Sequence, residues 1–171
     1  MKTIAQAQHA WLTIILLLAM VSAAHADQLD YENFSYNNLT PGVSTLDDTI
    51  RELGTPTLNR GNKVLIYGKE SIMVHFDKQQ KIIGIYLMMT PKVDIITPMS
   101  YYKELSNGNP DFIKKYGALY PYEKTKELPN ARVNHPRTYT VVWVSSATEK
   151  SIGFVYQGAE MTLCQIAVVN F

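Results

Sequence analysis

The chain has 171 residues, 18% of them charged, and a formal net charge of +1 at pH 7. A chain of this length forms one domain or two small ones in contact. Its near-neutral charge provides no basic field to attract nucleic acid or an anionic membrane surface, so we expect neither as a partner. The single cysteine, Cys164, excludes an internal disulfide and lies in an apolar run, which favours a buried, inert thiol over a nucleophile.

Residues 1–26 have the pattern of a secretory signal peptide. Lys2 gives a positive start, residues 10–21 form an apolar core, and residues 24–26 (Ala-His-Ala) give a small-x-small cleavage site before Asp27. The apolar core is shorter than the roughly 18 residues of a membrane span, which favours a cleaved signal over an uncleaved anchor. No cysteine stands near the cleavage site, so a lipid anchor is not indicated. The sequence predicts a soluble chain that is periplasmic or secreted after cleavage.

Residues 27–41 are polar and contain tyrosines without a clear periodicity, so we expect a loosely ordered lead-in. A first unit is predicted over residues 42–90. It begins with a short helix, because Ser44 or Thr45 can cap the first free N–H groups and Gly54 with Pro56 can end the helix.

Three strands follow this helix in the first unit. Residues 63–67, 71–76 and 81–89 are short runs rich in branched and aromatic side chains, and residues 77–80 form a polar turn between the last two runs. A helix of fewer than about 12 residues is marginal alone, so we expect it to pack on one face of this antiparallel meander.

A second unit is predicted over residues 91–171. Asn109 and Pro110 mark a helix start and Gly117 a helix end, while residues 151–156 repeat the pattern of residues 71–76. The second unit carries an inserted loop, residues 119–136, before its hairpin. The fold class is therefore α+β, with two related units, each a short helical segment on a three-stranded antiparallel meander. The alternative is that any two α+β segments look this similar.

Residues able to perform chemistry are few. After the signal only two histidines remain, His75 and His135, in different halves and without the spacing of metal ligands. His75 alternates with apolar residues on its strand, so we expect it to be exposed or interfacial. Asp47 and Asp48 are adjacent on a helix, so their side chains point in different directions. They are therefore typical of helix-capping residues and not of a catalytic pair. We predict no catalytic, cofactor-binding or metal site, and no enzyme activity.

Aromatic and basic side chains gather around the inserted loop. Tyrosine offers a large flat area at little cost in side-chain entropy, which suits contacts with proteins. The candidate protein-interaction residues are Tyr116, Tyr120, Tyr122, Lys124, Lys126, Arg132 and Arg137. Two alternatives stay open: the tyrosines line the core, or the loop is a solvated spacer.

One family resemblance rests on residues 42–45 (Gly-Val-Ser-Thr), residues 53–56 (Leu-Gly-Thr-Pro) and the hydrophobic meander that ends near Leu87. These resemble the SmpA/OmlA (BamE-like) domain, and the resemblance implies a short helical segment packed on a three-stranded antiparallel sheet. Two such units in tandem are also similar to the β-lactamase inhibitor protein fold. Neither family supplies catalytic residues to this sequence.

These observations predict an exported, non-enzymatic module that binds another protein, as a cell-envelope assembly or accessory factor. The alternative is a proteinaceous inhibitor of an extracellular or periplasmic hydrolase, which docks by a sheet face or by the inserted loop. A third hypothesis is a small-molecule binder or enzyme whose site the sequence pattern does not reveal.

Overall fold

The computed structural model describes residues 29–68, 71–89, 110–136 and 139–171, with the side chains of α3 from residue 114 onward. The signal-peptide prediction and the predicted N-cap at Asn109 lie outside these residues. The elements, in chain order, are β1 (Leu29–Asp30), β2 (Ser35–Tyr36), α2 (Leu46–Leu53), β3 (Leu58–Arg60), β4 (Val64–Tyr67), β5 (Ile72–Phe76), β6 (Ile82–Met88), α3 (Pro110–Leu119), α4 (Tyr122–Thr125), β7 (Ala131–Asn134), β8 (Tyr139–Ser145), β9 (Lys150–Gln157) and β10 (Thr162–Asn170).

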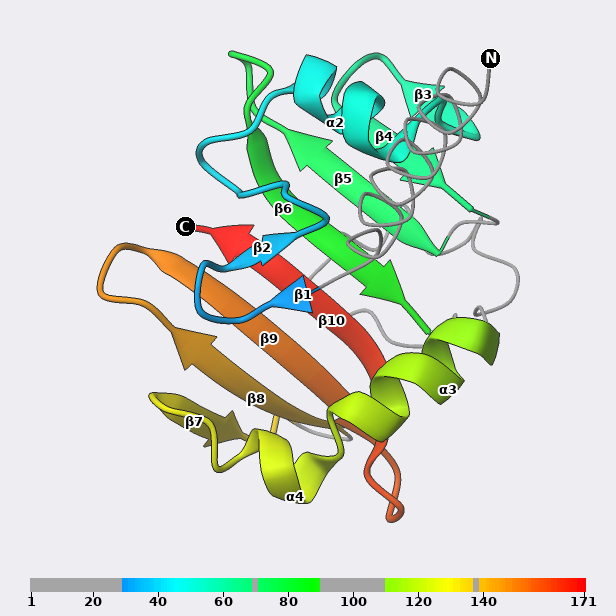
Figure 1. The fold of residues 1–171 in the computed structure, drawn as a ribbon. Coiled ribbons are helices and arrows are strands. Elements are labelled where there is room, and N and C mark those ends of the chain that lie inside the picture. The colour runs from blue at the N-terminus through cyan, green and yellow to red at the C-terminus, as the bar shows by residue number, and fades with distance from the viewer. Residues whose placement is uncertain (1–28, 69–70, 90–109, 137–138) are drawn as a thin grey trace, which may run out of the picture.

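Eight strands form one antiparallel sheet in the order β3-β4-β5-β6-β10-β9-β8-β7, and β1 pairs with β2 in a separate ribbon (Figure 1). The centre of the sheet is the β6–β10 pair, in which Leu87 lies opposite Ile166 and Ile85 opposite Val168. Each half of the chain contributes a four-stranded meander, and the last strands of the two meanders pair with each other.

The predicted α+β fold of two units, each a helical segment on its own three-stranded meander, is wrong. The protein is mostly β, with one continuous eight-stranded sheet and few short helices among the described residues. Two separate meanders would each leave an edge strand with unpaired N–H and C=O groups, and the β6–β10 pairing satisfies both rows at once. Sequence patterning missed β3 and β7 because these short outer strands are largely exposed and polar and do not alternate.

The predicted strands of the first half and the second hairpin are confirmed as β4, β5, β6, β9 and β10. Helix α2 is also confirmed, with Thr45 at its N-cap. The Thr45 amide donates to Asp48 Oδ2 at 2.8 Å, and the Asp48 amide donates to Thr45 Oγ1 at 3.2 Å. Gly54 ends the helix at a φ of 78°, a conformation that other residues rarely adopt.

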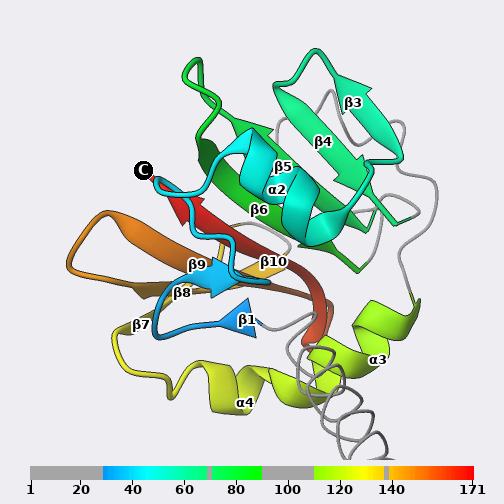
Figure 2. The same cartoon turned by 45° about the horizontal axis from the view of Figure 1, so that its top comes forward.

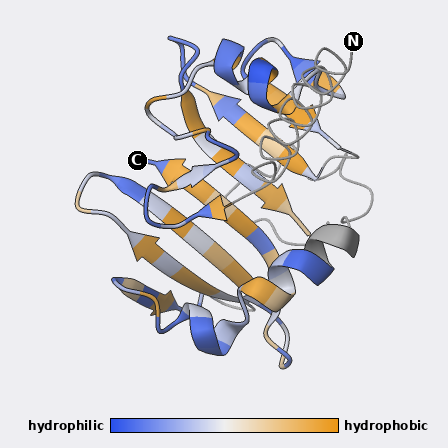
Figure 3. Cartoon of the chain, viewed as in Figure 1, coloured by the Kyte–Doolittle hydropathy of each residue, from blue (hydrophilic) through white to orange (hydrophobic). Residues whose placement is uncertain are grey.

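All the described helices and the β1–β2 ribbon lie on one face of the sheet (Figure 2). The core on this face follows a row of aligned residues: Leu65, Val74, Ile85, Val168 and Ile152. The central strands are mainly hydrophobic and α2 is mainly hydrophilic, since only one side of that helix meets the core (Figure 3). The opposite sheet face is apolar as well, with Met73, Val155 and Ala167 fully buried.

The lead-in of residues 27–41 was expected to be loosely ordered. The structure instead places Tyr36 and Leu39 in the core at 0% exposure. Phe34, Asn37 and Asn38 have positive φ values, so tight turns orient the apolar side chains there and no strand or helix period appears.

Residues 119–136 also differ from the predicted inserted loop. Helix α3 continues past Gly117 to Leu119, and α4 and β7 occupy much of the remaining segment. Helix α3 tolerates Gly117 in its interior because the cost of one glycine is only about 1 kcal/mol. The segment therefore forms part of one side of the molecule and includes one of the two edge strands of the sheet.

Candidate functional site

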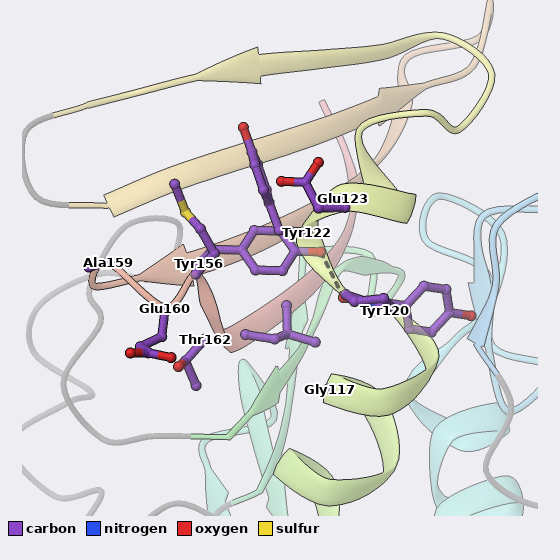
Figure 4. Close-up of a pocket in the computed structure, with 11 residues that line it drawn as sticks. Gly117, Tyr120, Tyr122, Glu123, Tyr156, Ala159, Glu160 and Thr162 are labelled. Carbon is purple, nitrogen blue, oxygen red and sulfur yellow. Dashed lines mark hydrogen bonds between the residues drawn. The ribbon is translucent and has the colours of Figure 1, made fainter.

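A pocket of about 470 Å³ lies where α3 meets α4 and the β9–β10 turn (Figure 4). We name this site the aromatic pocket. Its lining residues are Gly117, Tyr120, Pro121, Tyr122, Glu123, Tyr156, Ala159, Glu160, Met161, Thr162 and Leu163. The volume falls within the range of about 300–1,000 Å³ that is typical of ligand sites.

The wall of the pocket is fixed by the hydroxyl of Tyr156, which comes from β9. It lies 2.7 Å from Thr125 Oγ1 and 2.9 Å from the Tyr120 carbonyl oxygen, and these two acceptors share its single proton. Thr125 Oγ1 in turn donates to the Pro121 carbonyl at 3.0 Å. Burial raises the pKa of Tyr156, so this side chain is a neutral donor at physiological pH. The α3–α4 corner is thereby held against the sheet.

Aromatic contacts extend this wall. Tyr122 meets Tyr156 edge to face, with ring centres 5.4 Å apart, and Tyr120 packs on Phe154 at 5.0 Å. Such pairs contribute about 0.5–1.5 kcal/mol beyond the area that they bury. Tyr120 and Tyr122 therefore stabilise the fold and also line the pocket. Alanine at either position would lower stability and change the pocket at the same time.

The rim of the aromatic pocket carries two carboxylates from separate elements, Glu123 on α4 and Glu160 in the β9–β10 turn. Lys126 forms an ion pair with Glu123, and its ammonium lies 5.2 Å from the centre of the Tyr122 ring. The Glu123 carboxylate raises the pKa of Lys126. Within the described part of the chain, Glu160 has no ion-pair partner.

The structure brings only some of the predicted interaction residues together. Tyr120 and Tyr122 line the aromatic pocket, and Lys126 borders it. Lys124 is exposed on α4. Tyr116 is 1% exposed and stacks parallel to Tyr120 at 6.5 Å, so it belongs to the core and has no surface to offer a partner.

The two predicted arginines do not join this group. Arg132 lies on β7 and lines a second pocket, of about 320 Å³, with Ala131 and Ser145 among its neighbours. Arg137 lies outside the described residues.

Sequence reasoning missed the half of the pocket that comes from β9, β10 and their turn. Tyr156 reads as an ordinary strand residue, and Glu160 and Met161 read as a turn. The one usable signal in the sequence is Gly158, because glycine favours tight turns. In the structure its φ is 76°, and the chain reverses there in a hairpin. No local pattern shows which other element this hairpin contacts.

The remaining reactive side chains are dispersed. His75 is 8% exposed on the opposite sheet face, so the expectation of an exposed or interfacial histidine is wrong; burial lowers its pKa to about 4. His135 is exposed, with Nδ1 3.0 Å from Thr140 Oγ1. Cys164 is a buried thiol, as predicted. No group of three histidine, cysteine or acidic residues in the described ranges is placed to hold a metal ion.

The aromatic pocket thus combines aromatic and apolar side chains with carboxylates. Among residues 29–68, 71–89, 110–136 and 139–171, every helix is too short or too polar to cross a bilayer.

Comparison with known proteins gives no family. No protein-family model matches the chain, and no curated protein matches its sequence. Among solved structures, the chain has a low similarity to an extracellular protein containing a SCP domain from Bacillus anthracis str. Ames, with 11% identity and a TM-score of 0.35. The match covers 78% of this chain and 44% of that one, so this chain spans less than half of that protein's length.

Proposed function

We propose that this chain is an exported, non-enzymatic module that binds another protein through the aromatic pocket, as an assembly or accessory factor of the cell envelope. The observation that carries the proposal is a pocket with a rigid tyrosine wall and carboxylates at its rim. An apolar, well-fixed centre with a polar rim is the usual anatomy of a protein contact site.

The volume of the pocket and the anchoring of its wall support this proposal. A partner can place one or two side chains in about 470 Å³ without reorganising the wall, because Tyr156 already anchors the α3–α4 corner. A preformed site of this kind loses little free energy to ordering on binding.

The envelope setting rests on the sequence. The secretory pattern of residues 1–26 favours export, and the resemblance to the SmpA/OmlA domain favours a role among envelope proteins. The binding site and the location are thus supported by independent features of the chain.

The test is affinity capture from envelope extracts with tagged residues 27–171 as bait, followed by mass spectrometry. Three baits are compared: the natural sequence, Ala159→Trp, which fills the pocket from an exposed turn position, and Leu58→Trp. Leu58 is 39% exposed on β3, at the other edge of the sheet, and is the matched control.

We expect a partner that the natural and Leu58→Trp baits retain and the Ala159→Trp bait loses. A partner that all three retain equally would move the contact away from this pocket and overturn the proposal. Failure to retain any protein from extracts of the source envelope would overturn it as well.

A further inference from the structure

We propose that the aromatic pocket accepts a lysine or arginine side chain that the partner protein presents. This inference rests on the proposed function and names the chemical group that the partner supplies. It follows from the charges and ring faces that line the pocket.

Both charged residues in the lining of the pocket are acidic. Glu123 and Glu160 reach the rim from α4 and from the β9–β10 turn, so an incoming group meets negative charge from two elements. Glu160 has no ion-pair partner in the described residues, so its carboxylate is available to an incoming cation. An anionic ligand would be repelled by the Glu160 carboxylate, while the charge of Glu123 is offset by Lys126.

The Tyr122 ring in the wall favours the same kind of ligand. The face of a tyrosine ring carries negative charge density and attracts a cation within about 6 Å of its centre. Tyr122 lines the pocket and is partly exposed, so its ring is the one open to a ligand, whereas Tyr156 is 0% exposed and packs edge to face against Tyr122 (Figure 4). Met161 is partly exposed and provides apolar surface there, along which the methylene stem of lysine or arginine can pack while its charged head stays at the rim.

The protein already places a cation of its own at this rim. The Lys126 ammonium lies over the Tyr122 ring at 5.2 Å and pairs with Glu123. Both partners of this pair are partly or largely exposed, at 36% and 73% of their side-chain surfaces. Because exposed ion pairs are weak, an incoming cation can replace Lys126 at little cost. Lys126 is therefore an internal competitor for the ligand.

The test uses acetylated, amidated pentapeptides of sequence Gly-Ala-X-Ala-Gly, with lysine, norleucine or glutamate at X. Binding to ¹⁵N-labelled residues 27–171 is followed by NMR. We expect the lysine peptide to bind about two- to fivefold more tightly than the norleucine peptide, as one exposed ion pair or cation–π contact allows. Its shift changes should centre on Gly117, Tyr122 and Glu160. The glutamate peptide should bind least.

Variants assign the effect to named groups. Glu160→Gln should remove much of the preference for lysine, and Lys126→Met should strengthen binding of the lysine peptide about two- to fivefold. Glu149→Gln is the matched control, because Glu149 is an exposed carboxylate in the β8–β9 turn, at the opposite end of β9. It should change nothing, and the amide spectrum of each variant reports whether it is folded.

The two proposals fail separately. Binding no stronger for lysine than for norleucine, including no binding at all, overturns the cation inference even if Ala159→Trp still abolishes capture of a partner. A lysine preference with the predicted variant pattern, together with capture unaffected by Ala159→Trp, overturns the protein-binding function and leaves a pocket for free cations.

Discussion

The hydroxyl of Tyr156 donates a hydrogen bond to Thr125 Oγ1 at 2.7 Å, although the two residues lie 31 positions apart in the chain. The bond joins the C-terminal end of β9 to the end of α4. Because Tyr156 also donates to the Tyr120 carbonyl, one buried hydroxyl holds the α3–α4 corner against the sheet.

Tyr156→Phe should therefore lower the free energy of unfolding by about 1–2 kcal/mol, since it removes the donor that Thr125 Oγ1 and the part-buried Tyr120 carbonyl share. A double-mutant cycle with Thr125→Val should show a coupling energy of about 0.5–1.5 kcal/mol. Both are measured by urea unfolding. Tyr122→Phe is the control, because the Tyr122 hydroxyl makes no hydrogen bond among the described residues, and it should cost under about 0.5 kcal/mol. Equal costs at positions 122 and 156 would contradict the anchoring role.

The capping box of α2 predicts a stability change in acid. The hydrogen bonds from the Thr45 amide and hydroxyl, followed by Arg51, lower the pKa of Asp48 from 3.8 to about 2. A carboxylate with a lowered folded-state pKa stabilises the fold above its unfolded pKa and loses that contribution as pH falls through the folded value. The melting-temperature advantage of the natural chain over Asp48→Asn should thus hold from pH 7 to about 4 and shrink between pH 4 and 2.

The control for this acid series is Asp47→Asn on the same helical turn. Asp47 makes no hydrogen bond to Thr45, so Asp47→Asn should not lower the melting temperature between pH 7 and 4 as Asp48→Asn does. A difference between the natural chain and Asp48→Asn that stays constant down to pH 2 would contradict the role of the Asp48 charge.

Two glycines should respond oppositely to alanine. A Cβ on Gly84 would lie 2.7 Å from the hydroxyl of Tyr86 and 2.9 Å from its ring, and Tyr86 is 7% exposed against His75. Gly84→Ala should destabilise by about 1–3 kcal/mol. A Cβ on Gly117 would meet nothing within 4 Å, so Gly117→Ala should stabilise α3 by roughly 0.5–1 kcal/mol.

Thermal or urea unfolding measures both glycine variants. In a Tyr86→Ala background, the cost of Gly84→Ala should fall, because the ring that blocks the new methyl group is gone. An unchanged cost in that background would mean that the Tyr86 ring is not the obstacle.

Phe154 and Leu53 are both apolar positions that the sequence pattern predicts to be in the core, but the structure buries them to different extents. Phe154 is 0% exposed and contacts the Tyr120 ring, so Phe154→Ala should cost about 3–5 kcal/mol. Leu53 is only partly buried at the end of α2, so Leu53→Ala should cost less than about 2 kcal/mol. Denaturant unfolding of both variants gives the difference, and similar costs would place Leu53 deeper than the structure does.

Export is tested by the mass of the mature chain. Cleavage before Asp27 should give an intact mass equal to that of residues 27–171 without modification. A mass that includes residues 1–26, or an added acyl group, would contradict the predicted processing.

The sequence alone determined the elements whose signals are local. Thr45, Asp48 and Gly54 specify the limits of α2, because a capping box and a positive-φ glycine act within one helical turn. Strands β5 and β6 and their turn were equally predictable, since alternation and a polar connection lie within a dozen or so residues. The aromatic clustering around residues 116–122 was also visible.

Tertiary structure decided how these elements join and which of the aromatic residues form a site. Met88 and Gln165 pair across β6 and β10 although they are 77 positions apart, and no local period encodes that register. Tyr116 lies in the core and Tyr122 lines the pocket, because the hydroxyl of Tyr156, from a strand distant in the sequence, fixes the α3–α4 corner. Long-range pairing depends on the complementarity of whole faces, and a sequence pattern records only which side chains are available to make it.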